Sequence, residues 1–148
     1  MYGYVKVGSA VPKLRVADCV YNKEEILKLV EAAAAKQVRV LSFPELSVTG
    51  YTCADLFFQA PLLHAAEQAI QEIAEATEAL NIFLLIGAPI AVDNQMFNCA
   101  VALYKGKLLG IVPKTHIPNY SEFYEERWFA SADDLLTEEI TYAGQNVP

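Results

Sequence analysis

The chain has 148 residues, a length that fits one domain and is too short for two ordinary ones. Its net charge is −7 and it has no cluster of lysine and arginine, so it lacks the electrostatic footprint of a nucleic-acid-binding protein. Hydrophobic residues make up 54% of the chain, which is high for so small a domain. This content indicates that helices are buried on several sides or that apolar surface meets a partner.

The first part of the chain shows the pattern of a strand, a helix and a second strand. Residues 4–11 carry β-branched side chains and predict the first strand. Asn22 is expected to cap the helix, with Glu25 in capping-box position, and apolar residues at helical spacing continue to about Lys36. The apolar run at 38–43 predicts a buried strand, and the whole is the size of a unit with parallel neighbouring strands.

A second helix and a further buried strand follow. Pro61 fits the first turn of this helix, and Asn81 is expected to form its C-terminal cap. The continuous apolar run at 82–87 predicts a strand that is covered on both faces.

The remaining elements are predicted to make the sheet mixed. In residues 96–104 the side chains follow the alternating pattern of a strand, and a Lys-Gly turn connects them to residues 107–112. This predicts an antiparallel hairpin joined to the parallel strands. Aromatic residues at helical spacing predict a short helix over 121–130, and residues 139–142 have the composition to begin another strand.

The sequence also bears on location and on cofactors. It has no run of about 18 uncharged apolar residues, and its N-terminus lacks the charged segment followed by an apolar segment that marks a signal peptide. Its three cysteines are widely spaced, and two histidines, His64 and His116, do not indicate a metal site. Its glycines lie singly, so no dinucleotide fingerprint or P-loop can form. We expect a cytoplasmic homo-oligomer with free thiols and neither a membrane nor a nucleic-acid partner.

A carboxylate and an ammonium group each follow an apolar strand. Glu45 comes after the strand at 38–43, and Lys114 after the strand at 107–112. Open α/β sheets place ligand-binding side chains at such strand ends. There Glu45 could act as a general base, and Lys114 could stabilise a developing oxyanion. Alternatively, Glu45 is a solvated glutamate in a loop, and Lys114 is a charge that ends an edge strand. Each residue is followed six positions later by a tyrosine, Tyr51 or Tyr120, which favours the functional interpretation.

Several stretches resemble a known family. Residues 43–51 (Phe-Pro-Glu-Leu-Ser-Val-Thr-Gly-Tyr) resemble the glutamate motif of the nitrilase superfamily of carbon-nitrogen hydrolases, and residues 113–120 resemble its lysine motif. Residues 50–57 and 121–129 are similar to one branch, the N-terminal glutaminase domains of glutamine-dependent NAD synthetases. The resemblance covers nearly the whole chain.

This resemblance implies an α/β fold, the N-terminal part of an α-β-β-α sandwich with a mixed sheet, and a Glu-Lys-Cys triad. Glu45 would be the general base that activates a cysteine, Lys114 would support the tetrahedral intermediate, and Glu122 would be a supporting second glutamate near the lysine. Tyr51 and Tyr120 match positions that line the glutamine pocket. Glutamine would lose ammonia through a γ-glutamyl thioester, which water then hydrolyses.

In the family the nucleophilic cysteine lies well downstream of the lysine motif, whereas Cys19, Cys53 and Cys99 all precede Lys114. We therefore expect residues 1–148 to be the N-terminal portion of a single carbon-nitrogen hydrolase domain, truncated before that cysteine and catalytically incomplete alone. An exposed sheet edge and an uncovered apolar face should result. No cofactor is expected in this chain, since ATP and Mg²⁺ would belong to a synthetase domain further on.

Two alternatives stay open. One is a free-standing amidase of the same superfamily that acts on another small amide. The other is a non-catalytic half-sandwich that assembles with copies of itself or with a second chain.

Overall fold

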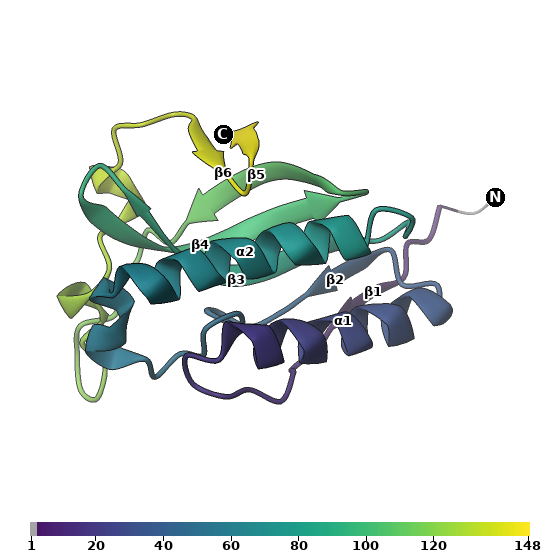
Figure 1. The fold of residues 1–148 in the computed structure, drawn as a ribbon, viewed down its shortest axis with the longest axis horizontal. Coiled ribbons are helices and arrows are strands. Elements are labelled where there is room, and N and C mark those ends of the chain that lie inside the picture. Colours follow the sequence, from purple (N-terminus) through teal and green to yellow (C-terminus); the bar gives the residue numbers. More distant parts are fainter. Residues whose placement is uncertain (1–2) are drawn as a thin grey trace.

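The computed structural model describes residues 3–148, whose main feature is one mixed five-stranded sheet (Figure 1). Its strands lie in sequence order across the sheet: β1 (Val7–Ser9), β2 (Val40–Ser42), β3 (Phe83–Val92), β4 (Gln95–Tyr104) and β5 (Lys107–Pro113). The pairs β1–β2 and β2–β3 are parallel, and the pairs β3–β4 and β4–β5 are antiparallel. The predicted mixed α/β fold is therefore confirmed.

Two helices, α1 (Cys19–Ala35) and α2 (Ala60–Ala76), cover one face of this sheet (Figure 1). Each turns an apolar stripe inward, with Ile26 and Val30 of α1 and Ile70 and Ile73 of α2 fully buried. Pro61 lies in the first turn of α2, as predicted. No helix within residues 3–148 has the length and apolar character needed to cross a membrane.

The predicted caps of both helices are wrong. Asp18 caps α1, because its carboxylate accepts a hydrogen bond from Tyr21 N at 3.0 Å. Asn22 is buried inside the helix, where its amide bonds the backbone of Arg15 and of Val48 and so joins two loops. Helix α2 ends at Thr77, well before Asn81.

The strands differ in length from the prediction. Strands β1 and β2 are shorter than expected, whereas β3 continues past residue 87 to Val92. A two-residue turn joins β3 to β4, with Asp93 at φ 51° and Asn94 at φ 63°. Both angles are those of a type I′ turn, which asparagine and aspartate tolerate better than most residues.

The C-terminal part contains little helix. The predicted helix over 121–130 is wrong, because only a 3₁₀ turn at Glu125–Arg127 forms there. The strand predicted at 139–142 is present as β6 (Ile140–Tyr142), which pairs with β7 (Gln145–Val147). This hairpin packs beside α2, where Ala143 N donates to Glu67 Oε1 at 2.8 Å.

The face of the sheet opposite the helices is open among residues 3–148. Side chains alternate between the two faces of a strand, so the register places Val7, Val40, Phe83, Ala100 and Val112 together on this face. Val7 is 66% exposed and Val112 is 63% exposed. The expected uncovered apolar face is thus present.

Candidate active site

Glu45 lies in a turn that follows β2 and rests directly on β3. Leu46, the next residue, has φ 52° and is fully buried. Val48 N donates to the carbonyl oxygen of Gly87 at 3.2 Å. A Cβ atom at Gly87 would lie 2.4 Å from Leu46 N and 2.5 Å from Pro44 O, so only glycine lets the turn approach this closely. The backbone of Glu45 is therefore fixed by contact with the sheet.

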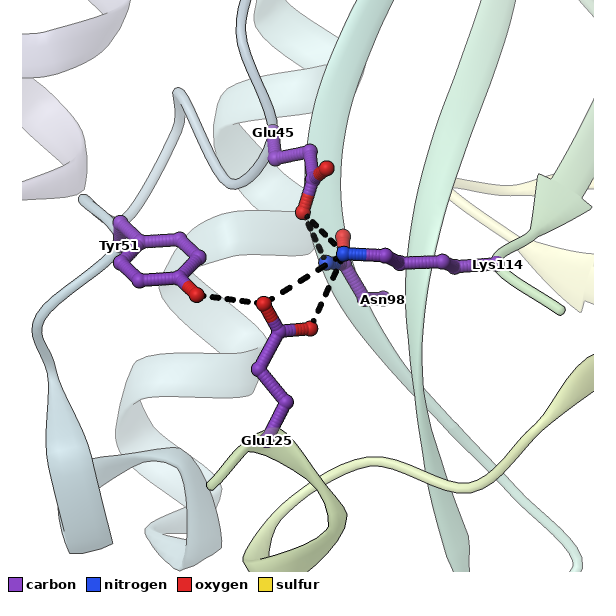
Figure 2. Close-up of polar contacts among 5 residues, drawn as sticks. All are labelled: Glu45, Tyr51, Asn98, Lys114 and Glu125. Atoms are coloured by element: carbon purple, nitrogen blue, oxygen red, sulfur yellow. Dashed lines mark hydrogen bonds and ion pairs between the residues drawn. The ribbon is translucent and has the colours of Figure 1, made fainter. Parts of the chain in front are cut away.

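Lys114 follows β5 and reaches the same point on the open face. Its backbone N–H donates to the carbonyl oxygen of Asn98 in β4 at 2.8 Å. Its Nζ atom donates to Glu45 Oε2 at 2.8 Å (Figure 2). The structure thus brings together the two residues that the sequence analysis singled out.

A second carboxylate, Glu125, completes the group. It lies in the 3₁₀ turn Glu125–Arg127, is 3% exposed, and accepts from Lys114 Nζ at 3.1 Å through Oε2. The hydroxyl of Tyr51 donates to its other oxygen (Figure 2). Lys114 therefore stands between two carboxylates.

A polar clip joins the loop that carries Tyr51 to the turn that carries Glu125. Asp55 accepts from Arg127 Nε at 2.8 Å, from Arg127 Nη2 at 2.7 Å and from Trp128 Nε1 at 3.0 Å. These hydrogen bonds lower the pKa of Asp55 to about 2. Phe57 packs beneath the clip against the ring of Trp128.

The ionisable groups of the site influence one another. Burial alone would lower the pKa of Lys114, but its hydrogen bonds to Glu45 and Glu125 outweigh burial and raise it. Burial and the hydrogen bond to Glu125 raise the pKa of the Tyr51 hydroxyl. Lys114 is therefore a cation and Tyr51 a neutral donor at neutral pH.

An open hollow of about 530 Å³ lies over these groups, within the size range of small-ligand sites. Its charged lining residues are Glu45, Lys114 and Glu125, and aromatic rings form the wall. The rings that line it are those of Tyr51, Tyr120 and Phe123. Tyr120 is 68% exposed and packs edge-on against Phe123. The hollow can admit a small polar molecule next to the ion pair.

The structure does not bring Glu122 to the lysine. Its side chain is exposed and lines a neighbouring hollow with Tyr51 and Thr52, and no hydrogen bond within residues 3–148 joins it to Lys114. Glu125 takes that position instead, because the 3₁₀ turn directs it inward and leaves Glu122 outside. The predicted location of Glu122 beside the lysine is therefore wrong.

Sequence reasoning also missed Asn98. This residue is 3% exposed in β4, and its Nδ2 atom donates to Glu45 Oε2 at 2.8 Å. A polar residue inside an apolar strand was the available signal, since a buried amide needs a partner. No comparable signal separated Glu125 from Glu122.

All three cysteines are buried with free thiols. Burial raises the pKa of the Cys19 thiol to about 11 and that of Cys99 to about 12, and it also raises that of Cys53. A thiol that stays protonated is a poor nucleophile. Residues 3–148 contain no group of three or more His, Cys, Asp or Glu side chains that could hold a metal ion.

The sequence profile named carbon-nitrogen hydrolase matches residues 6–145. The glutamine-dependent NAD(+) synthetase of Mycobacterium leprae is 36% identical over 132 residues, which cover 89% of this chain and 19% of that protein. The enzyme of the same name from Aquifex aeolicus is 34% identical over 84% of this chain and 22% of its own length. The chain thus spans about a fifth of the length of these relatives.

A solved structure of a glutamine-dependent NAD(+) synthetase from Cytophaga hutchinsonii superimposes with a TM-score of 0.89 at 28% identity, over 97% of this chain and 24% of that one. An amidase from Nesterenkonia sp. has the same fold, with a TM-score of 0.68 at 19% identity over 93% of this chain and 52% of that one.

Proposed function

Because the chain belongs to the carbon-nitrogen hydrolase family, we propose that it forms part of a domain that hydrolyses glutamine and releases ammonia. The observation that carries this proposal is the contact of Lys114 Nζ with Glu45 at 2.8 Å and with Glu125 at 3.1 Å, on the floor of an open hollow. A general base beside a held cation is the arrangement that amide hydrolysis by a covalent route requires.

In this proposal Glu45 is the general base and Lys114 stabilises the negative charge that develops on the amide oxygen. Glu125 holds Lys114 in place, in the supporting role that the sequence analysis gave to Glu122. Tyr51 and Tyr120 form part of the wall against which glutamine binds.

A cysteine from outside residues 1–148 supplies the nucleophile in our proposal. The burial of Cys19, Cys53 and Cys99 supports this, because burial raises the pKa of all three thiols. The cysteine proton passes to Glu45, sulfur bonds to the amide carbon, and the C–N bond breaks as the nitrogen takes that proton and leaves as ammonia. Water then hydrolyses the thioester and restores the thiol. Residues 1–148 alone are thus catalytically incomplete, as the N-terminal portion of the hydrolase domain.

We further propose that the ammonia serves NAD synthesis in the cytoplasm, within a homo-oligomer. The names of the relatives support the role in NAD synthesis, and the free thiols are consistent with the cytoplasm. ATP and Mg²⁺ would be bound by a separate synthetase domain.

Ammonia release from glutamine tests the proposal. It should be measured for residues 1–148 alone and for the protein that also carries the downstream cysteine. We expect turnover only in the second, with kcat lowered about 10²–10⁴-fold by Glu45→Gln, since the base is lost. Glu24→Gln, which changes an exposed glutamate of α1, is the matched control and should keep full activity.

The other outcomes separate the alternatives. Turnover by residues 1–148 alone that Glu45→Gln abolishes would contradict the proposed incompleteness. Hydrolysis of another small amide but not of glutamine would indicate the free-standing amidase. If no amide is hydrolysed and the chain forms a stable assembly, the interaction module would be favoured.

A further inference from the structure

Asn98 is a buried amide in an otherwise apolar part of β4. Its neighbours Phe97 and Cys99 belong to the core on the helical side, whereas Asn98 faces the open side with the site. Its side chain is 3% exposed, and Nδ2 donates to Glu45 Oε2 at 2.8 Å. Placing an amide here costs stability unless it is hydrogen-bonded, so the contact with Glu45 compensates for its burial.

Asn98 also holds the backbone of Lys114 in place. The carbonyl oxygen of Asn98 accepts from Lys114 N at 2.8 Å, which continues the ladder between β4 and β5 beyond Pro113. Asn98 therefore contacts Glu45 through its side chain and Lys114 through its backbone. One strand residue sets the positions of both groups relative to each other.

These contacts make the two oxygens of the Glu45 carboxylate different. Oε2 accepts from both Lys114 Nζ and Asn98 Nδ2, each at 2.8 Å. No hydrogen bond from residues 3–148 reaches Oε1, which points away from both donors (Figure 2). A carboxylate oxygen that already accepts two hydrogen bonds is less available for a proton than one that accepts none.

We propose that Asn98 is a positioning residue that orients the Glu45 carboxylate, so that Oε1 is the oxygen that takes up the proton of the nucleophile. This inference rests on the proposed function, in which Glu45 is the general base. The S–H bond breaks as the O–H bond to Oε1 forms, and the electron pair stays on sulfur. Without Asn98 the carboxylate can rotate, and the two oxygens exchange places against Lys114.

Substitution of Asn98 tests the inference in the protein that carries the downstream cysteine. Asn98→Leu keeps the branching and the number of side-chain heavy atoms but removes the donor, and we expect kcat to fall about 10–100-fold while KM changes less than about threefold. Asn98→Asp keeps the shape, and we expect at least the same loss. It should also move the acid limb of the kcat/KM profile to higher pH, because two adjacent carboxylates repel each other.

A matched control separates positioning from general destabilisation. Thr77→Val removes buried hydrogen bonds to Ile73 O at 2.8 Å and Ala74 O at 3.3 Å, at the end of α2 and far from the site in sequence. It should lower the melting temperature and leave kcat and the pH profile unchanged. Unchanged kcat in folded Asn98→Leu, or an equal effect of Thr77→Val on the pH profile, would overturn the inference.

A readout that needs no activity keeps this test independent of the proposed function. Side-chain amide NMR of residues 1–148 should show one Asn98 proton shifted downfield, and Glu45→Gln should change that shift. Crystal structures of Asn98→Leu should show the Glu45 carboxylate rotated or in two orientations. A protein that hydrolyses no glutamine would refute the proposed function. An unmoved amide signal and an unmoved carboxylate would refute the role of Asn98.

Discussion

Lys114 is the residue on which the charge balance of the site depends. It contacts two carboxylates, of which Glu45 is half exposed and Glu125 is 3% exposed. An exposed ion pair contributes little to stability, but a buried carboxylate that loses its cation is costly. The two ion pairs of Lys114 should therefore differ in what they contribute to the fold.

We predict that Lys114→Met lowers the free energy of unfolding by about 2–3 kcal/mol, because Glu125 is left buried without a cation. Urea unfolding at neutral pH measures this loss. Lys28→Met is the control: it breaks the exposed pair with Glu25 on α1 and should cost less than about 0.5 kcal/mol. Adding Glu125→Gln to Lys114→Met should recover part of the loss. An equally large loss in the control would contradict the argument.

The same variant should change the response to alkali. The pKa of Lys114 is raised in the folded chain, so its contribution to stability is complete below the unfolded pKa of about 10.4. That contribution is lost as pH rises through the higher folded pKa. Unfolding curves recorded from neutral pH into the alkaline range should therefore show a smaller loss of stability in Lys114→Met than in the unchanged chain.

At the scale of elements, the site depends on how closely the turn after β2 approaches β3. We predict that Gly87→Ala displaces the turn, since the added Cβ would lie 2.4 Å from Leu46 N. Backbone atoms cannot move away from such a clash without a cost in stability. Stability should fall by about 1–3 kcal/mol, and the contact between Glu45 and Lys114 should lengthen. Urea unfolding and a crystal structure of the variant measure the two effects.

The control for this change is Gly110→Ala in β5. Its Cβ would lie no closer than 3.7 Å to another residue, at Pro148 O, which is ordinary van der Waals contact. It should leave the Glu45 turn in place. A Gly87→Ala chain with unchanged stability and unchanged Glu45 geometry would show that the close approach is not needed.

The elements that the sequence predicted well are those in which local pattern and packing agree. Apolar periodicity located α1, α2 and the β4–β5 hairpin, because these bury continuous stripes in one core. The caps failed where a side chain has a tertiary partner: Asn22 bonds the backbone of a distant loop instead of its own helix end. The predicted helix near Glu125 failed for a related reason. Aromatic packing of Trp128 and Phe129 on Phe57 holds that segment without regular backbone hydrogen bonds.

The site was predictable only in part. Glu45 and Lys114 could be found because each lies just past the end of a strand. Strands β2 and β5 run in the same direction, so their C-terminal ends lie at the same edge of the sheet. Asn98 stood out as a polar residue in an apolar strand, but its partner Glu45 depends on the register of the sheet and could not be read from the strand itself. Glu125 reaches Lys114 through a turn, and no local pattern indicated that contact. The choice between Glu122 and Glu125 depends on which way a short 3₁₀ turn faces, and this follows from the clip between Asp55 and Arg127.

For the whole molecule, the main consequence of the fold is that its two faces differ. Helices α1 and α2 and the β6–β7 hairpin cover one face, while the other presents Val7 and Val112 to solvent. The site lies on this open face, since Lys114 follows Val112 by two positions and alternation places both on the same side. Apolar side chains exposed on a sheet face favour association.

We therefore predict that isolated residues 1–148 self-associate through the open face in a concentration-dependent way. Val112→Lys places a charge on that face and should shift the chain toward monomer in sedimentation velocity experiments, because a buried ammonium opposes contact. The stability of the monomer should change little, since Val112 is already 63% exposed. Leu136→Lys is the control: Leu136 is 90% exposed but lies outside the sheet, before β6. If both variants weaken association equally, or if the unchanged chain stays monomeric at every concentration, the open face is not the contact surface.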